Sequence, residues 1–111
     1  MIKETNYYTY IIRCNDNSLY TGITTDLNRR FNEHFNKTEK CAKYTLKHQA
    51  LKMEAAWISS SRVLASKLEY HIKKLPKIKK EILIKENNLE ILEPKIEKSN
   101  YTKLNLLDYF K

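Results

Sequence analysis

The sequence contains very little glycine, proline or cysteine. Its 111 residues include one glycine, two prolines and two cysteines. This composition excludes a collagen-like or other glycine- and proline-rich chain. Cys14 and Cys41 cannot form the multi-disulfide framework of a small secreted domain, and no Cys-x-x-Cys or clustered Cys/His spacing indicates zinc. We therefore expect both thiols to be reduced and to have structural roles.

Long hydrophobic runs are also missing. No segment approaches the roughly 20 apolar residues that span a bilayer. The N-terminal sequence MIKETNYYTY lacks the basic-then-apolar pattern of a secretory signal. These absences predict an intracellular, cytoplasmic protein without a membrane partner. The hydrophobic content of 41% is enough for a core, and the length corresponds to about one domain.

Acidic residues are outnumbered by basic ones. Lys and Arg total 21 against 13 Asp and Glu, which gives a formal net charge of +8. Such an excess on a small domain favours a polyanionic partner, most often nucleic acid. A general lysine bias that only aids solubility would give the same totals, so net charge leaves both interpretations open.

The N-terminal third predicts a β-hairpin. Residues 7–13 are β-branched and aromatic, the cluster CNDNS is typical of a turn, and LYTGI forms the returning strand. Side chains alternate along a strand, so Tyr10 and Tyr20 share a face if the loop around NDN has three or five residues.

A helix is predicted after the hairpin. Asp26 is its expected N-cap, and the helix extends to about residue 36. Its buried stripe is expected to consist of Leu27, Phe31 and Phe35. The polar, lysine-rich residues 37–48 are expected to form a loop.

The remaining pattern predicts one more strand and two more helices. Residues 50–58 are rich in good helix formers, but their alternation and the closing Trp57 and Ile58 favour a strand. Serines cap a helix over 62–75 whose apolar face holds Leu64, Leu68, Ile72 and Leu75. Pro76 starts a third helix, with an inward face of Ile78, Ile82 and Leu83. The order β-β-α-β-α-α predicts an α/β (α+β) domain with a small, mainly antiparallel three-stranded sheet flanked by helices. We assign 1–88 to this domain and 89–111 to a C-terminal extension.

Several chemically useful side chains meet where the second strand leads into the first helix. Gly22 permits close approach of a ligand to the backbone, and the following helix N-terminus suits a phosphate. Arg30 and His34 lie one turn apart and lean toward the sheet. Each residue alone is more simply explained as structural: a turn glycine, a surface arginine and a core-edge histidine. Together with Tyr10 and Tyr20, they indicate a site.

These residues also carry a family resemblance. YTY at 8–10, YTG at 20–22 and TDLNRRFNEHF at 25–35 resemble the GIY-YIG nuclease domain, in its small stand-alone branch. AKYT at 42–45 and VLASKLEYHIKKL at 63–75 extend the similarity, which covers roughly residues 5–85. Tyr8 and Thr9 replace the glycine and isoleucine of the first motif.

The resemblance implies an endonuclease that hydrolyses DNA phosphodiester bonds, with structure-selective or weak sequence preference, in DNA repair, recombination or processing. It places Tyr10 beside the attacking water and Tyr20 against the scissile phosphate or the water. It implies that Arg30 neutralises charge on the phosphate and that His34 supports this group. A phenol is a poor base near neutral pH, so the metal, His34, Lys43 or Arg30 must assist Tyr10.

The resemblance also implies one divalent ion, Mg²⁺ or Mn²⁺, held by Glu69. A hard cation suits a carboxylate completed by water and substrate. The plain alternative is an exposed i,i+4 pair of Glu69 with Lys73. The late polar residue of larger family members has no convincing equivalent among Asn87, Asn88 and Asn100.

Further nucleic-acid contacts are predicted in the basic segment after the first helix. Lys43 and Lys47 would contact the DNA backbone and Tyr44 would stack on a base or sugar, unless this segment is simply a solvated loop. RNA remains an alternative polymer. A catalytically silent nucleic-acid-binding module of the same fold is the alternative function.

The C-terminal sequence KLNLLDYFK resembles peptides that dock on DNA sliding clamps. Leu106 would be the aliphatic plug, and Tyr109 and Phe110 the aromatic pair. Lys103 stands where those peptides usually have glutamine. The alternative is that these apolar residues fold back on the domain.

Overall fold

The computed structural model describes residues 6–37, 42–86 and 89–106. One four-stranded antiparallel sheet has the order β2-β1-β3-β4, formed by β1 (Tyr7–Cys14), β2 (Leu19–Thr24), β3 (Ala50–Ser59) and β4 (Thr102–Lys103). Four helices pack around it: α1 (Leu27–Phe35), α2 (Lys43–Lys47), α3 (Arg62–Lys73) and α4 (Lys77–Glu86). Two 3₁₀ turns follow, η1 (Leu89–Leu92) and η2 (Lys98–Asn100). The predicted α+β class is confirmed, and β4 extends the expected three-stranded sheet to four strands.

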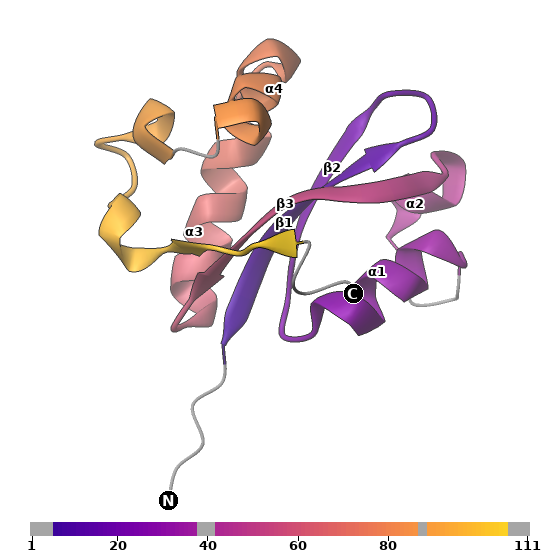
Figure 1. The fold of residues 1–111 in the computed structure, drawn as a ribbon, viewed down its shortest axis with the longest axis horizontal. Coiled ribbons are helices and arrows are strands. Elements are labelled where there is room, and N and C mark those ends of the chain that lie inside the picture. Colours follow the sequence, from indigo (N-terminus) through magenta and orange to yellow (C-terminus); the bar gives the residue numbers. More distant parts are fainter. Residues whose placement is uncertain (1–5, 38–41, 87–88, 107–111) are drawn as a thin grey trace, which may run out of the picture.

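The sheet separates two groups of helices. In Figure 1, α1 and α2 lie on one side of the strands, and α3 and α4 on the other. The α3 side buries Ile11, Trp57 and Leu68 in one cluster, and the α1 side buries Ile12 and Leu27 in a second. Alternate side chains of the central strands β1 and β3 therefore pack into two small cores, one on each face of the sheet.

The β1–β2 hairpin has the three-residue loop that the sequence allowed. The amide of Cys14 donates to the Ser18 carbonyl at 2.8 Å, and the amide of Asn17 donates to the Cys14 carbonyl at 2.9 Å. Asn17 has a φ of 71°, the left-handed conformation that asparagine tolerates. The resulting register pairs Tyr10 with Gly22 and places Tyr20 on the same face. This prediction is confirmed.

Helix α1 begins as predicted, but its buried face differs. Asp26 caps it by accepting from the Arg29 amide at 3.1 Å. Phe35 is 46% exposed, whereas His34 is fully buried. The expected stripe through Phe35 is therefore wrong, because α1 presents the Leu27–His34 ridge to the sheet.

Two expectations about the following helices also change. The segment 37–48 was expected to be a loop, yet Lys43–Lys47 form α2. Ser61 caps α3 as predicted, through the Leu64 amide at 3.2 Å. In α4, Leu83 is buried as expected, but Ile78 is 69% exposed and does not belong to the inward face.

The residues after α4 complete both cores. Leu92, Ile96 and Tyr101 belong to the cluster on the α3 side, and Leu104 and Leu106 pack on the α1-side cluster. Leu106 thus folds back on the domain, which is the alternative to the clamp-peptide interpretation. Tyr109 and Phe110 lie outside the described residues.

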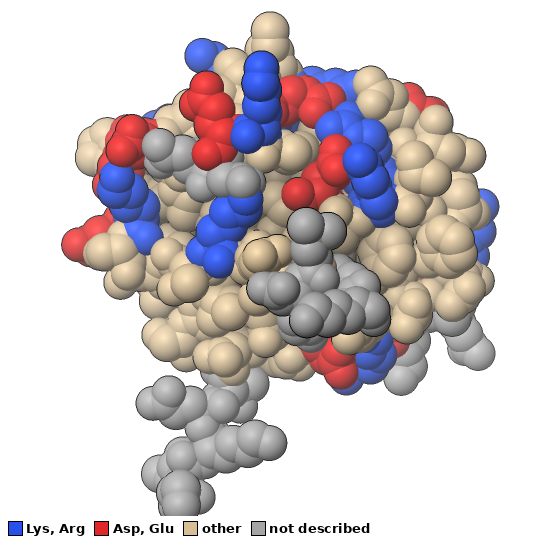
Figure 2. Space-filling view, in the orientation of Figure 1, with Lys and Arg blue, Asp and Glu red and all other residues tan. Residues whose placement is uncertain are grey.

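Charge on the visible face does not form a single-sign patch. Figure 2 shows basic and acidic side chains interspersed there, with broad areas that carry neither. Cys14 is buried with a free thiol, and burial raises its pKa, as expected of a structural cysteine. Cys41, Asn87 and Asn88 lie outside the described residues. Among the described helices, none is long and apolar enough to cross a membrane.

Candidate active site

The predicted site residues meet at the edge strand β2. Tyr10 and Tyr20 lie on the same sheet face with ring centroids 6.3 Å apart, and the His34 ring lies 5.8 Å from Tyr10 and 5.2 Å from Tyr20. Helix α1 supplies Arg30 and His34. Helix α3 supplies Glu69, whose charge acts on Tyr10. Residues from three separate segments thus converge on one phenol.

The position of the Tyr10 side chain leaves no room for a side chain at Gly22. It lies within β2 rather than at its end, and no left-handed backbone is involved. A Cβ at this position would lie 2.4 Å from the Tyr10 hydroxyl oxygen and 2.7 Å from its Cζ. The Tyr10 ring therefore crosses directly over the Gly22 backbone. The approach of a phosphate to Gly22 stays a prediction.

A buried chain of hydrogen bonds begins at Tyr10. Its hydroxyl oxygen lies 2.8 Å from His34 Nε2, and His34 Nδ1 lies 2.7 Å from Thr45 Oγ1. Thr45 donates its own proton to the Ala42 carbonyl at 3.1 Å, so it can only accept from His34. His34 is then the Nδ1–H tautomer, and its Nε2 accepts the Tyr10 proton.

Burial sets the protonation of both rings. It lowers the pKa of His34 to about 4, with the positive charge of Arg30 acting in the same direction. Burial also raises the pKa of Tyr10 above its usual range, helped by Tyr20 and opposed by the hydrogen bond and charge of Arg30. Both groups are neutral at pH 7, with the shared proton on Tyr10.

Arg30 provides positive charge next to the phenol. Its side chain is 22% exposed and forms an ion pair with Glu33 at 3.0 Å. It also hydrogen-bonds to Tyr10. Because one edge of the guanidinium stays accessible, Arg30 can meet a phosphate while it contacts the buried tyrosine.

Glu69 and Lys73 reach past the edge strand toward Tyr20. Lys73 Nζ lies 3.3 Å from Glu69 Oε2 and 5.8 Å from the centre of the Tyr20 ring. The i,i+4 ion pair of Glu69 with Lys73, which the sequence offered as the plain alternative, therefore forms, and it lies beside Tyr20. Nothing in the pairing prevents Glu69 from binding a cation instead, since its side chain is 24% exposed.

The donor set fits a metal only if the substrate completes the shell. Within the described residues, no group of three or more His, Cys, Asp or Glu side chains could hold an ion. One carboxylate with water and phosphate oxygens is a known ligand set for Mg²⁺, which keeps several waters. Glu69 is the residue that would hold it.

The basic segment predicted to contact DNA lies beside Tyr20. Tyr44 stacks on Tyr20 at 5.6 Å and on His48 at 4.2 Å. Lys43 and Lys47 are exposed and line a shallow hollow with Tyr44. The structure thus brings these three predicted contact residues next to the site, whereas their binding to nucleic acid stays a prediction.

Two residues of the site were missed from the sequence. Thr45 fixes the tautomer of His34, and Lys73 lies over Tyr20. Lys73 had a detectable signal, because it is spaced i,i+4 from Glu69. Thr45 ends the AKYT segment that extends the family resemblance, but only the fold places a threonine of a five-residue helix against a histidine eleven positions earlier.

The arrangement agrees with comparisons to known proteins. A model of the GIY-YIG catalytic domain matches residues 6–82. The chain belongs to the GIY-YIG family. The five predicted catalytic and metal-binding residues of this GIY-YIG chain lie within the matched segment: Tyr10, Tyr20, Arg30, His34 and Glu69.

Small bacterial members are similar to this GIY-YIG chain. UPF0213 protein FN1575 of Fusobacterium nucleatum is 45% identical over 78 residues, which cover 70% of this chain and 76% of that protein. UPF0213 protein YhbQ of Salmonella typhimurium is 45% identical over 82 residues, covering 74% and 80%. The solution NMR structure of UPF0213 protein BH0048 from Bacillus halodurans aligns with a TM-score of 0.47 and 41% identity, over 72% of this chain and 83% of that one.

Proposed function

We propose that this GIY-YIG domain is an endonuclease that hydrolyses DNA phosphodiester bonds with one Mg²⁺ or Mn²⁺ ion. The observation that carries the proposal is the buried chain from Tyr10 through His34 to Thr45. Burying three polar side chains is costly unless each is hydrogen-bonded. A chain that ends in a fixed tautomer beside an arginine is suited to moving a proton next to an anion.

The proton leaves the attacking water through Tyr10. The water oxygen forms a bond to phosphorus while its proton passes to the Tyr10 hydroxyl, and the Tyr10 proton passes to His34 Nε2. The two transfers occur together, so neither a free phenolate nor an isolated imidazolium has to form first. Negative charge on the substrate phosphate beside Arg30 favours the imidazolium that results. The phosphorus–oxygen bond to the leaving strand breaks, and solvent protonates that oxygen.

The remaining side chains hold the phosphate. Arg30 offers a planar fork to its oxygens and neutralises charge that develops on them. The Tyr20 ring lies 5.2 Å from the His34 ring of α1 and 5.8 Å from Lys73 Nζ, and we expect its hydroxyl to contact the phosphate. Glu69 would hold the divalent ion, which would supply positive charge to the phosphate.

Access to Tyr10 sets a condition on this mechanism. The Tyr10 side chain is 1% exposed, and its neighbours Tyr20 and Arg30 are half-buried. A water reaches the phenol when one of these neighbours moves aside. We expect the substrate phosphate to draw Arg30 toward itself and to open this path.

The experiment is a cleavage assay on labelled duplex, single-stranded, flapped and branched DNA with Mg²⁺, Mn²⁺ or EDTA. Wild type should cut only with metal, and Glu69→Gln should lose cutting. Glu90→Gln is the matched control. Glu90 is an exposed glutamate outside the site, and its Oε1 lies 2.8 Å from Lys98 Nζ. Salt-sensitive binding without cutting would contradict the proposal and support a silent binding module. With labelled single-stranded and duplex RNA included as substrates, cutting of RNA and of none of the DNAs would reassign the substrate to RNA.

A further inference from the structure

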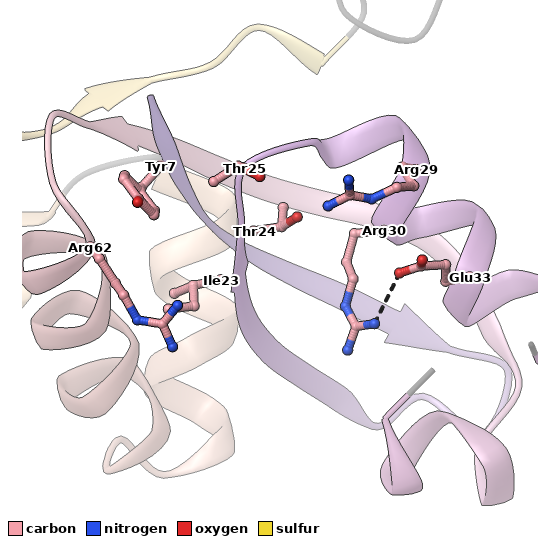
Figure 3. A pocket seen from close by; sticks show the side chains of 8 residues that line it. All are labelled: Tyr7, Ile23, Thr24, Thr25, Arg29, Arg30, Glu33 and Arg62. Atoms are coloured by element: carbon pink, nitrogen blue, oxygen red, sulfur yellow. Dashed lines mark hydrogen bonds and ion pairs between the residues drawn. The ribbon is translucent and has the colours of Figure 1, made fainter. Parts of the chain in front are cut away.

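A cleft opens beside Arg30 at the end of the sheet. It has a volume of about 450 Å³ and is lined from α1, α3 and the adjoining strand ends. In Figure 3, Arg29 and Arg30 extend from α1 on one side and Arg62 extends from α3 on the other, with Tyr7 and Thr25 at its wall. The cleft is therefore continuous with the active site through Arg30.

Arginine is used selectively in this chain. Only four of the 21 Lys and Arg residues are arginines, and three of the four line this cleft. The fourth, Arg13, is bound to Glu54 at 2.7 Å and to Glu81 at 2.5 Å. A general lysine bias explains the net charge, but it does not explain why three of the four arginines line one cleft. Arginine differs from lysine in presenting a planar fork that matches phosphate oxygens.

Two of these arginines occupy unfavourable helix positions. Arg29 lies in the first turn of α1, Arg62 is the first residue of α3, and neither first turn contains an acidic residue. The N-terminus of a helix is its positive end, so a cation there is disfavoured. Asp26 caps α1 but does not line the cleft. Both positions become favourable when an anion binds between the helices.

The positive charge of the cleft is not cancelled internally. Glu33 is its lining carboxylate, and it pairs with Arg30 at 3.0 Å. Among the described residues, no ion pair joins Arg29 or Arg62 to a carboxylate. Two exposed guanidinium groups therefore face the cleft from opposite walls.

We propose that this cleft binds the backbone phosphates next to the scissile phosphate on the same nucleic-acid strand. This inference rests on the proposed function only in taking a nucleic acid as the substrate. Arg30 lies at both sites and sets the scissile phosphate at one end of the cleft. Arg29 and Arg62 then bind the next phosphates along the strand from opposite walls of the cleft. The half-buried Tyr7 ring offers a surface on which a sugar or base can pack.

The test is DNA binding in EDTA, where no cutting interferes. Anisotropy of a labelled duplex and a labelled single strand is followed over a range of NaCl concentrations. The Arg29→Gln/Arg62→Gln double variant should bind at least about tenfold more weakly than wild type. Its slope of log K against log[NaCl] should be shallower by about 1.4–1.8, because each lost phosphate contact removes roughly 0.7–0.9.

A charge-matched control is available on α4. Lys77 and Lys85 are exposed, and α4 lies near the end of α3 opposite to Arg62 (Figure 1). The Lys77→Gln/Lys85→Gln variant should retain most of the slope. The Arg29→Gln/Arg62→Gln variant, here called the cleft variant, should also have a melting temperature at or above that of wild type. The substitutions remove two positive charges from helix N-termini, where cations are disfavoured.

The outcomes separate this inference from the proposed function. A cleft variant that binds with the slope and affinity of the control overturns the inference, whether or not wild type cuts DNA. A cleft variant that loses binding only because its melting temperature falls also overturns it. Cleft-dependent binding by a wild type that never cuts supports the inference and contradicts the nuclease.

Discussion

Tyr10 and Gly22 face each other across β1 and β2, and the close packing between them has a measurable consequence. Gly22→Ala should lower the free energy of unfolding by about 1–3 kcal/mol, the usual cost of overpacking. The added Cβ would meet the Tyr10 oxygen at 2.4 Å and must displace the ring. Urea unfolding measures the change, and a Tyr10→Ala background should remove most of it. An equal cost in both backgrounds would show that Tyr10 is not the cause.

His34 makes stability depend on pH. Its pKa is lowered to about 4 in the folded protein, against about 6.5 when unfolded. Between these two pKa values the unfolded chain binds more protons than the folded protein. The stabilisation that neutral His34 gives the fold is therefore complete above pH 6.5 and is lost as pH falls toward 4. From pH 7 to about pH 4.5 the loss due to His34 should be about 2.5 kcal/mol.

A His34→Gln variant isolates this effect from other titrating groups. Asp16 and Glu81 also have lowered pKa values, through hydrogen bonds from Ser18 and Arg13 respectively, and both lose stabilising interactions in acid. Urea unfolding of both proteins at the two pH values gives the difference. If wild type and variant lose the same free energy in acid, His34 is not held neutral by the fold.

At the scale of single elements, α2 depends on one hydroxyl. Thr45→Val keeps the shape of the side chain but leaves His34 Nδ1–H without its acceptor, at a cost of about 1–3 kcal/mol. The same change frees the tautomer of His34, so ¹⁵N shifts of the imidazole should show a mixture in place of Nδ1–H alone. Thr45→Ser should behave as wild type. An unchanged tautomer in Thr45→Val would refute the hydrogen-bond assignment.

The sequence predicted most elements and missed those that depend on tertiary contacts. The hairpin, both caps and β3 follow from local turn chemistry and alternation, as Asn17 and Asp26 show. Helix α2 and β4 have five and two residues, too few for a periodic pattern. The buried face of α1 was misjudged because His34 is polar, and only its bonds to Tyr10 and Thr45 make its burial favourable.

The candidate site was predictable in its members but not in their connections. Tyr10, Tyr20, Arg30 and Glu69 were selected from spacing and resemblance, and the fold brings them together. The reason for Gly22 lay in a cross-strand contact that spacing does not reveal. Arg62 is far from Arg29 in the sequence, so the cleft between them becomes visible only once α1 and α3 are placed.

For the whole molecule, the segment 89–106 is part of the fold. The Leu104 amide donates to the Ala56 carbonyl at 2.9 Å, and Leu104 and Leu106 pack on the cluster that contains Tyr10. The Leu104→Ala/Leu106→Ala variant should lose about 2–4 kcal/mol, less than two fully buried leucines, because both are half-buried. Thermal unfolding tests this. Unchanged stability would instead favour a segment available to a partner such as a sliding clamp.

The most direct test of the central claim is the single-turnover rate of DNA cleavage by Tyr10→Phe in Mg²⁺. The hydroxyl is the only group of Tyr10 that this change removes, and general acid–base catalysis contributes roughly 10²–10⁴-fold. Tyr70→Phe is the control, since Tyr70 is 54% exposed on α3. The proton path through Tyr10 and His34 predicts a fall of at least about 100-fold in Tyr10→Phe and none in the control. Equal rates in the two folded variants would contradict it.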